Sequence, residues 1–588
     1  MKKQWHLLPT APTSFHENFS SLPSVVATLL YNRNIQNKEA IEEFLQPEYQ
    51  KHIHDPFLFT EMAQAVERIF AAIEKNEKIT IHGDYDADGV SASTILTDTL
   101  FALGANHVDV YLPHRETDGY GLNTNTIDYL HTQGTKLIIT CDCGISNTKE
   151  VSHGNTLGID TIITDHHAVP ETLPEACATI HPKLPKETYP CKTLSGGAVA
   201  FKLAQGLLAQ HKKEHETLAH GETHAGFEKW LLDMVAIANV ADMVPLIGET
   251  RTLTKFGLLV LNKTRRIGLK KLFIETGIAE TDGTLKHAIT EETIGFRLAP
   301  QINAAGRLDH ANTAYKLMVA KSGAEGIDLA YALNEQNKER RALTLEYVDE
   351  ARKQIIGKQD ANPILFVYSD RWTTGIIGLI ASRLKDEFHK PTIAMAPKQG
   401  EVTGSGRSIK GFSLIGAMQE IPEHFSKFGG HPMACGFSLA NPEGMLDLRD
   451  ALCERYTKNT KDVDMTPLLE IDAEIRLEDI TWELYDSLEL LTPFGQGNPK
   501  PQYMAKDVKI QKVEAMGKDA RHLKLHLTHH TPVIRKAIGW SMCDSNGTQN
   551  WCNLLQTGDV IDIVFEIDIN EWNGRRELRI TLTDIRKS

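Results

Sequence analysis

Three aspartates at alternate positions are the residues best suited to bind a metal ion. Asp84, Asp86 and Asp88 lie in the segment ITIHGDYDADGVSAS (79–93), directly after a short apolar stretch. Crowded carboxylates repel one another unless a cation lies between them, and their hard oxygen atoms suit Mg²⁺ or Mn²⁺. An acidic helix cap or a Ca²⁺ loop is the alternative. The position that holds a glutamate in an EF-hand, the twelfth, is Ile95 here.

Similar polar residues follow other apolar segments further along the chain. Asp142, between Cys141 and Cys143, ends KLIITCDCG (136–144), and TIITDHH (161–167) ends in an aspartate and two histidines, Asp165, His166 and His167. We expect Asp242 in AIANVADMVPL (236–246) to be a fourth contribution of the same kind. Each could be a cap or a buried histidine if taken alone. Four such segment ends together favour a two-metal hydrolase site.

The elements between these motifs alternate between apolar β-prone segments and helical patterns. Strands are expected at 79–81, 108–113, 136–141 and 161–164, with helices at 60–77, 91–103 and 123–131. This alternation predicts βαβ units and a parallel sheet, whose ligand site lies beyond the carboxyl ends of the strands. In a strand, Cys141 and Cys143 share the face opposite to Asp142, so we expect them to pack in the core.

The composition sets broad limits on the class of protein. The chain has 588 residues, of which 41% are hydrophobic and 24% charged, and its formal net charge is −14. This length predicts three or four domains. There is no apolar signal core or membrane span, and the eight cysteines form no CxxC pair or dense disulfide framework, so a reducing cytoplasm is expected. The negative charge argues only weakly against a nucleic-acid-binding enzyme, because a basic groove can be local.

Taken in order, the motifs HGDYDADG, CDCG, TDHH and ANVADMVPL resemble those of the DHH phosphoesterase superfamily. The nearest resemblance is to its RecJ family of single-strand-specific 5′→3′ DNA exonucleases. Later segments extend it, namely LSGGAVAFKL (194–203), RLAPQINAAGRL (297–308), WTTGIIGLIASRL (372–384), GSGRSI (404–409) and FGGHPMACG (428–436). Gln301 stands where the family usually has an arginine, and Thr373 stands where it frequently has a histidine. These departures put the expected phosphate or DNA contacts at the two positions in question.

The resemblance implies a set of site residues and a pair of Mn²⁺ or Mg²⁺ ions. Asp142 is the expected bridging ligand, and Asp142, His166 and His167 are the expected catalytic residues. The superfamily also has a His-x3-Asp-x-Asp pattern, so it stays open which of His82 and Asp84 is a direct ligand. The predicted metal ligands are His82, Asp84, Asp86, Asp88, Asp142, His166 and Asp242. The predicted substrate-binding residues are Arg297, Arg307, Gly375, Arg383, Arg407, Gly430 and His431.

The second half of the chain begins with a predicted helix at 323–357, which lacks proline and internal glycine after Gly326. Its charges Lys338, Arg340 and Arg341 are mostly expected to be solvated. A second strand–helix alternation follows, with glycines that suit a close approach to phosphate and with Arg407 to pair with it. By resemblance this is the DHH-associated domain. The basic segment KTRRIGLKK (263–271) is more simply a solvated face than a nucleic-acid contact.

From about residue 463, alternating β segments separated by turn signals predict a small OB-fold barrel, entered through the loop PFGQGNPKP (493–501). Such barrels bind single strands by base stacking and phosphate contact. The predicted contact residues are Lys518, Arg521, His522, Trp572, Arg575 and Arg576.

The predicted architecture is therefore an α/β parallel-sheet domain and an α/β DHH-associated domain joined by a long helix, with a C-terminal all-β barrel. The expected boundaries are an N-terminal lead-in (1–50), a DHH catalytic domain (51–322), a connecting helix (323–358), a substrate-binding domain (359–458) and an OB-fold domain (463–588). The resemblance implies metal-dependent hydrolysis of single-stranded DNA to 5′-mononucleotides in repair and recombination, alongside single-strand-binding protein and a RecQ-type helicase. A phosphodiesterase for short oligonucleotides or cyclic dinucleotides, or a non-catalytic replication scaffold, is the alternative.

Overall fold

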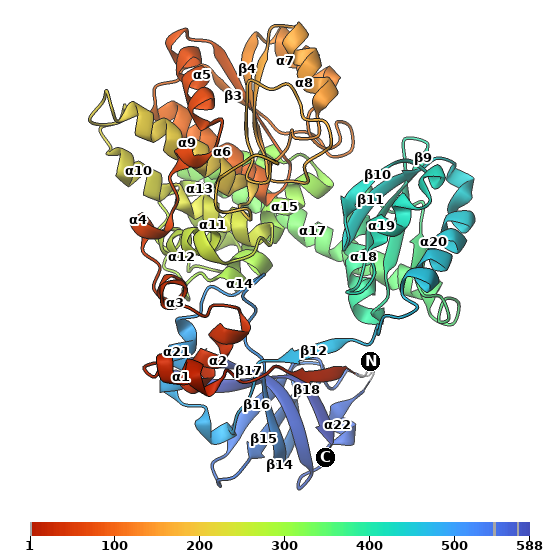
Figure 1. Ribbon diagram of the computed structural model, residues 1–588. Helices are drawn as coiled ribbons and strands as arrows, with labels where there is room; N and C mark the ends of the chain where they lie inside the picture. The colour runs from red at the N-terminus through yellow and green to blue at the C-terminus, as the bar shows by residue number, and fades with distance from the viewer. Residues whose placement is uncertain (1–2, 545–548, 573–574, 588) are drawn as a thin grey trace. The chain divides into compact units, whose positions relative to one another are not determined.

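The computed structural model describes residues 3–544, 549–572 and 575–587 and divides into two compact units (Figure 1). The larger unit comprises residues 53–244 and 252–465, and the smaller unit comprises residues 1–52, 245–251 and 466–588. The smaller unit is therefore built from the two ends of the chain. The N-terminal residues, predicted to be a separate lead-in, instead belong to the unit that contains residues 466–588.

The larger unit contains the predicted parallel sheet. Its five strands run in the order β3-β2-β4-β5-β6, and every neighbouring pair is parallel. The strands are β2 (Lys78–Gly83), β3 (Val108–Tyr111), β4 (Thr135–Cys141), β5 (Asp160–Thr164) and β6 (Ala178–Ile180). Because β4 lies between β2 and β5, the residues after these three strands meet at one edge of the sheet, as the alternating pattern predicted.

Helices cover both faces of this sheet, as its apolar strands require. The pair α7 (Thr124–Thr132) and α8 (Thr148–Thr156) packs on one face through a core that includes Ile138 and Ile163 (Figure 1). The helices α5 (Met62–Glu74), α6 (Ala87–Ala102) and α9 (Gly196–His211) pack together on the opposite side. Almost every residue of α6 is buried. The helix that begins in the aspartate motif is thus held firmly by its neighbours.

A helical region follows the sheet and leads into the long connecting helix. Its elements are α10 (His224–Trp230), α11 (Leu232–Ala241), α12 (Gly248–Leu261), α13 (Ile267–Glu275), α14 (Glu291–Thr293), η2 (Ile294–Leu298), α15 (Ala299–Leu308) and α16 (Asn312–Val319). The long helix α17 (Gly323–Ile355) is continuous, as predicted, and contacts α13, α15 and α16. The helix α15 carries the predicted substrate residue Arg307.

A mixed sheet forms the remainder of the larger unit. Its strands are β7 (Leu365–Tyr368), β8 (Thr392–Lys398), β9 (Glu401–Arg407), β10 (Phe425–His431) and β11 (Ala434–Leu439), in the order β10-β11-β9-β8-β7. Only β7 and β8 pair in parallel, and the other neighbours are antiparallel. The helices are α18 (Thr374–Phe388), α19 (Leu414–Gln419) and α20 (Met445–Asn459). This is the second α/β domain that the sequence predicted.

The smaller unit contains a closed barrel of five strands. They are β14 (Tyr503–Met516), β15 (His522–Thr528), β16 (Arg535–Gly539), β17 (Val560–Trp572) and β18 (Arg575–Lys587), and pairing of β14 with β17 closes the ring. Strand β13 (Ala473–Glu474) adds to β14, and β1 (Gln4–Leu7) pairs in parallel with β12 (Leu468–Ile471). Helices α2 (Ser24–Asn32), α3 (Lys38–Leu45) and α21 (Trp482–Glu489) share the barrel's core. The OB-fold prediction is confirmed.

Two further features concern the cysteines and the lengths of the helices. Cys543 and Cys552 form a disulfide, which the sequence analysis did not anticipate, whereas Cys141 and Cys143 are free and fully buried, as expected. None of the helices in the described part of the chain combines the length and apolarity that a membrane span requires.

Candidate metal centre

The carboxyl ends of three neighbouring strands deliver the predicted ligands to one place. Asp84 and Asp86 follow β2, Asp142 follows β4, and His166 follows β5. Asp242 also reaches this place, but the prediction that it ends a strand is wrong. It is the C-terminal cap of α11. A buried helix and a buried strand give the same short apolar signal in sequence, which explains the error.

These side chains form three overlapping groups, each able to hold a cation. The groups are Asp84, Asp86 and Asp142; Asp88, His166 and Asp242; and Asp142, His166 and His167, and the ligand atoms within each lie within 4.8 Å of one another. Nε2 of His166 lies 3.0 Å from Oδ1 of Asp142 and 3.7 Å from carboxylate oxygens of both Asp88 and Asp242. Asp142 and His166 are each shared by two groups. This sharing is the arrangement that a pair of neighbouring cations needs.

Several of these atoms are buried without a hydrogen-bond partner. They include Oδ1 of Asp84, Oδ1 of Asp142 and Nε2 of His166. A buried polar atom left unpaired costs about 1–3 kcal/mol, and more if it is charged. Cations bound in the groups to which these atoms belong would satisfy all three, with Asp142 belonging to a group with Asp84 and to another with His166. The oxygen-rich donor set with one imidazole fits Mg²⁺ or Mn²⁺ better than the sulfur- and nitrogen-rich sites that Zn²⁺ prefers.

The electrostatics of the carboxylates also favour bound cations. Burial, and then the charge of Asp86, raise the pKa of Asp84 to about 8. The same two causes raise the pKa of Asp242 to about 7. Burial first, and neighbouring carboxylates next, raise the pKa values of Asp88 and Asp142 well above the ordinary range. The four carboxylates can therefore be charged together only when cations are bound beside them.

Backbone amides hold two of the carboxylates in place. Asp86 caps α6 and accepts hydrogen bonds from the amides of Asp88 and Gly89 at 2.9 and 3.1 Å. Asp88 accepts from the amides of Gly196 and Gly197, at 2.8 and 2.7 Å, where α9 begins. A Cβ atom on Gly196 would lie 2.5 Å from the Asp142 side chain. Only glycine fits there, and this gives the Gly-Gly pair a role that the sequence analysis did not assign.

Asp142 and the histidine pair are oriented by Tyr120, which was not predicted, and by Asp165, which was placed at the same segment end without a role of its own. Asp142 has φ 62°, a left-handed conformation, and its carbonyl accepts a hydrogen bond from the hydroxyl of Tyr120 at 3.1 Å. The Tyr120 hydroxyl also lies 3.1 Å from Nδ1 of His167. Asp165 accepts from the amides of His166 and His167 and lies 2.8 Å from Nδ1 of His167. Asp165 thus positions the histidines.

The two histidines differ in charge, since His166 is neutral and His167 is protonated. Burial, and then His167, lower the pKa of His166 to about 3, so its ring is neutral and can bind a metal. Burial opposes the charge on His167, but the hydrogen bond and the charge of Asp165 raise its pKa to about 9. Neutral His166 is suited to be a ligand, and protonated His167 is suited to contact an anion.

His82 is the predicted ligand that no group contains. It is fully buried in β2, its Nδ1 lies 3.8 Å from the sulfur of Cys143, and its Nε2 has no hydrogen-bond partner. Its ring stacks on Tyr111 at a centroid distance of 5.4 Å. Within the described residues, Asp84 belongs to a candidate metal group and His82 does not.

A second cluster, which we call the arginine cluster, comprises Arg115, Arg307, Arg340 and Arg407. Burial, and then Arg115 and Arg340, lower the pKa of Arg307 to about 9, and Arg407 contributes in the same direction. Nη1 of Arg307 donates to the carbonyl of Gly375 at 3.0 Å, and Nη1 of Arg407 donates to the carbonyl of Gly406 at 2.8 Å. Like charges held together in this way need an anion as a partner.

Two members of the arginine cluster were not predicted. Arg115 lies 4.1 Å from the centroid of the Tyr85 ring, and Tyr85 stands between two of the metal-site aspartates in sequence. The buried Nε of Arg115 has no hydrogen-bond partner. Arg340 was expected to be a solvated charge of the connecting helix. It is instead half-buried and donates to Asn337 at 2.8 Å.

The other predicted substrate residues differ in how near they lie to the metal centre and the arginine cluster. His431 lies near His167 and Lys183, since burial and then these two charges lower its pKa. Gly430 has φ 137°, which favours glycine, and a Cβ on Gly375 would lie 2.2 Å from the carbonyl oxygen of Arg307. Arg383 is exposed beside Arg340. Arg297 is exposed and donates to the carbonyl of Thr276 at 2.7 Å, apart from the charges that act on Arg307.

The two positions that depart from the family pattern have structural roles. Gln301 is buried in α15, and its Nε2 donates to Asn334 of α17 at 3.3 Å. Thr373 is the N-terminal cap residue of α18, without a side-chain capping bond. Gln301 therefore joins α15 to α17 through an uncharged contact.

The predicted contact residues of the barrel lie in the loop between β14 and β15 and at the ends of β15, β17 and β18. Lys518 and Arg521 are exposed between β14 and β15, and the ring of His522 packs against Trp540 at 5.0 Å. The guanidinium of Arg576 lies 5.4 Å from the ring centroid of Trp482, and Arg575 is exposed. The Trp572 side chain lies outside the described residues. Trp540 is a half-exposed aromatic that the sequence analysis did not name.

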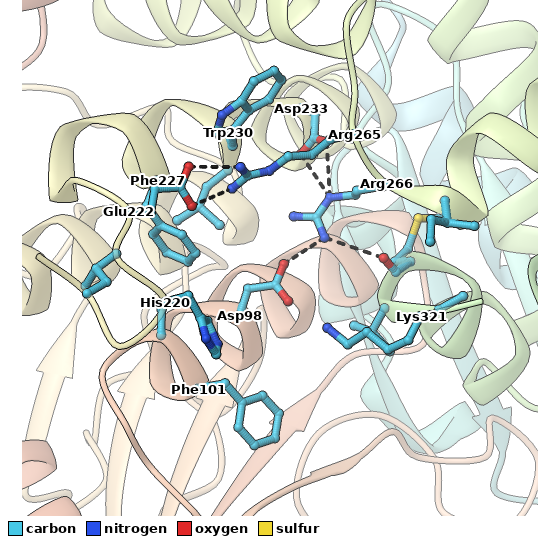
Figure 2. Close-up of a pocket in the computed structure, with 17 residues that line it drawn as sticks. Asp98, Phe101, His220, Glu222, Phe227, Trp230, Asp233, Arg265, Arg266 and Lys321 are labelled. Carbon is cyan, nitrogen blue, oxygen red and sulfur yellow. Dashed lines mark hydrogen bonds and ion pairs between the residues drawn. The ribbon is translucent and has the colours of Figure 1, made fainter. Parts of the chain in front are cut away.

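A cavity of about 320 Å³ lies away from the metal centre, and it contains part of the basic segment 263–271. Figure 2 shows that both of its arginines are held by carboxylates. Arg265 pairs with Glu222 at 2.8 Å, and Arg266 pairs with Asp98 at 2.7 Å and with Asp233 at 3.1 Å. The charge of each arginine is therefore balanced by carboxylates of the protein itself. The expectation of a solvated face fits Arg265, whose side chain is 48% exposed, but not Arg266, whose side chain is only 11% exposed.

Comparison with known proteins agrees with this geometry. Family models match at residues 78–238 (DHH family, N-terminal domain), 361–458 (DHHA1 domain) and 471–584 (RecJ OB domain). The chain is 36% identical to the single-stranded-DNA-specific exonuclease RecJ of Bacillus subtilis over 95% of its own length and 67% of that protein. It is 30% identical to RecJ of Escherichia coli, covering 96% of both chains. The chain belongs to the RecJ family.

Solved structures support the fold assignment. The crystal structure of RecJ from Thermus thermophilus in complex with Mn²⁺ superimposes with a TM-score of 0.81, covering 100% of this chain and 80% of that one, at 24% sequence identity. The Mg²⁺ complex of the same protein gives a TM-score of 0.76. A RecJ family member therefore shares the fold of this chain, from the parallel sheet to the barrel.

Proposed function

We propose that this RecJ family member is a metal-dependent exonuclease that hydrolyses single-stranded DNA from its 5′ end to 5′-mononucleotides. The observation that carries the proposal is the pair of shared ligands, Asp142 and His166, in a cluster of crowded and buried carboxylates. Relatives named as single-stranded-DNA-specific exonucleases, one of them solved with Mn²⁺ and with Mg²⁺, support the substrate and the ions.

The residues divide the work of phosphodiester hydrolysis between them. Asp84, Asp86, Asp88, Asp142, His166 and Asp242 would hold two divalent ions. Two such ions, when bound, supply an activated water and stabilise charge on the phosphate and the leaving oxygen. Asp165 and Tyr120 hold protonated His167, which is placed to contact a phosphate oxygen. The protein thereby presents a positive group to the substrate beside its metal ligands.

The arginine cluster and His431 would bind the phosphates of the strand. Arginine pairs with phosphate through a planar fork of donors, and Arg307 and Arg407 are already fixed by backbone carbonyls. Exposed Trp540, Lys518 and Arg521 of the barrel would contact single-stranded DNA by base stacking and phosphate pairing. The barrel argues against a phosphodiesterase for dinucleotides, since a short substrate has no use for a second binding domain.

A single assay tests the proposal. A strand labelled at its 5′ end, and the matching duplex, are incubated with Mn²⁺, Mg²⁺ or EDTA. We expect labelled mononucleotide to be released from the single strand with either ion and not with EDTA. Cleavage of dinucleotides only would favour the small-substrate alternative, and strand binding without cleavage would favour the scaffold.

We also propose a cellular setting on the basis of the family. The protein would act in the cytoplasm in DNA repair, recombination and mismatch repair, with single-strand-binding protein and a RecQ-type helicase as partners that supply its substrate. Deleting the gene and measuring recombination and mismatch-repair frequencies tests this setting.

A further inference from the structure

Four histidines lie within fourteen residues in the segment HKKEHETLAHGETH (211–224). They form two His-x3-His pairs, His211 with His215 and His220 with His224. A short histidine-rich tract of this kind is a compositional sign of metal binding. The segment joins the end of α9 to the start of α10, and none of its histidines belongs to the candidate metal centre described above.

The fold brings three of the four imidazoles together. Nδ1 of His211 lies 2.9 Å from Nε2 of His224, although these residues are 13 positions apart. The ring of His215 stacks on that of His211 at a centroid distance of 4.2 Å, and the His211 and His224 centroids are 5.2 Å apart. Burial first, and then Lys212 and His215, lower the pKa of His224, so His215 also lies near His224. His220 instead lines the cavity that contains Arg265 and Arg266.

We propose that His211, His215 and His224 form a second metal site, which takes a transition-metal ion such as Zn²⁺ or Ni²⁺. Imidazole nitrogens suit these ions, whereas Mg²⁺ and Mn²⁺ prefer the oxygen ligands of the first centre. Zn–N bonds of about 2.0–2.1 Å in a tetrahedral site place two ligand nitrogens roughly 3.3 Å apart. The nitrogens of His211 and His224 therefore need to separate by only a few tenths of an ångström, while the proton of their hydrogen bond moves to the other nitrogen of the donor ring so that both present lone pairs to the ion.

His215 completes the site by a rotation of its side chain. Its nitrogens do not converge with those of His211 and His224 in the stacked arrangement, because the ring lies face-on against His211. The residue is exposed on the turn after α9, and among the described contacts no hydrogen bond holds its ring. Among the described contacts, rotation about its side-chain bonds would break only the stacking on His211. A water molecule or the neighbouring carboxylate of Glu214 would supply a fourth ligand.

The experiment compares the full-length protein with two single variants, His215→Ala and His220→Ala. Each protein is stripped with EDTA, incubated with a small excess of Zn²⁺, passed through a desalting column and analysed for bound zinc by mass spectrometry. The first metal centre is identical in all three proteins, so it cancels in the comparison. We expect His215→Ala to retain one zinc ion per chain fewer than the wild type and His220→Ala to retain the same number.

His220→Ala is the matched control because it removes an exposed histidine from the same tract without touching the cluster. Equal zinc in the wild type and His215→Ala would overturn the proposal, as would an equal loss in both variants. Circular dichroism checks that the exposed substitution leaves the fold intact. Absorption of the Co²⁺-loaded proteins gives a second readout, since the intense visible bands of tetrahedral cobalt should weaken only in His215→Ala. Exonuclease activity with Mg²⁺ should be unchanged in both variants, so failure of this proposal is separate from failure of the proposed function.

Discussion

The acidic metal centre and the arginine cluster are alike in structure but opposite in charge, because each holds side chains of one charge close together. Each gathers like charges in a buried or half-buried place, and burial first, then repulsion, shift the pKa values, upward for Asp84 and downward for Arg307. Backbone groups of the matching polarity hold each set, amides for Asp88 and carbonyls for Arg407. Repulsion that the fold maintains in this way indicates a ligand of opposite charge. The acidic centre therefore suits bound cations and the arginine cluster suits a bound phosphate, so the two clusters together suit a phosphate with a cation beside it.

The largest expected effect comes from removing the shared charge of the acidic centre. Asp142→Asn keeps the size of the side chain but leaves a neutral amide where two ligand groups meet. We expect the exonuclease rate to fall by roughly 10³-fold or more, because the substitution weakens both cation positions together. Gel-shift measurement of strand binding should show little change. A parallel loss of binding would mean that Asp142 supports the fold or the strand rather than catalysis.

Removing one charge from the arginine cluster should have a smaller effect. Arg407→Ala is expected to lower kcat/KM for a single strand by about 10- to 100-fold, since a charge-assisted phosphate contact contributes roughly 1.5–3 kcal/mol. The dependence of binding on salt concentration should become shallower, because fewer counterions are released. Arg297→Ala is the matched control, since that exposed arginine lies outside the cluster and should keep near-normal kinetics. Equal losses in the two variants would remove the distinction between them.

The last expected effect is on stability rather than on activity, and it is a pH dependence in the metal-free protein. The folded-state pKa values of Asp84, about 8, and Asp242, about 7, lie above the ordinary carboxyl value, and that of His167, about 9, lies above the ordinary imidazole value. The folded state then binds more protons than the unfolded state, so the free energy of unfolding should fall between about pH 6.5 and 9, by up to about 1.4 kcal/mol per pH unit for each proton of difference.

Urea titrations in EDTA at several pH values would measure this slope. Adding Mg²⁺ should flatten it, because a bound cation lets the carboxylates be charged without repulsion and stabilises the folded state by mass action. Asp142→Asn should also flatten it in EDTA. A stability that rises with pH across this window would contradict the charge state assigned to the acidic centre.

The sequence predicted the acidic centre better than the arginine cluster, for a topological reason. Parallel strands converge at one edge, so residues after 136–141 and 161–164 could be placed together without knowing any contact. The same rule, applied to the strand that ends at Tyr111, would have pointed to the following loop, which holds Arg115 and Tyr120. That loop has no periodic pattern of its own, and neither residue was considered.

Other features depend on contacts between distant segments and leave no local signal. Arg340 has the sequence context of a solvated helix charge, and only the packing of neighbouring helices makes it half-buried. The pairing of Gln4–Leu7 with Leu468–Ile471 joins segments more than 460 residues apart in the sequence. A short strand at a chain terminus can be recognised only when its partner is known.

The pairing of β1 with β12 has a consequence for how the chain folds during synthesis. The first 52 residues leave the ribosome long before residues 466–588, which complete their unit. At about 5–20 residues per second, the apolar face of α2, with Val26, Leu29 and Leu30, waits for tens of seconds without its barrel. Nascent chains stalled before residue 466 should therefore expose this face and be cut by protease within it, whereas the released full-length protein should be resistant there.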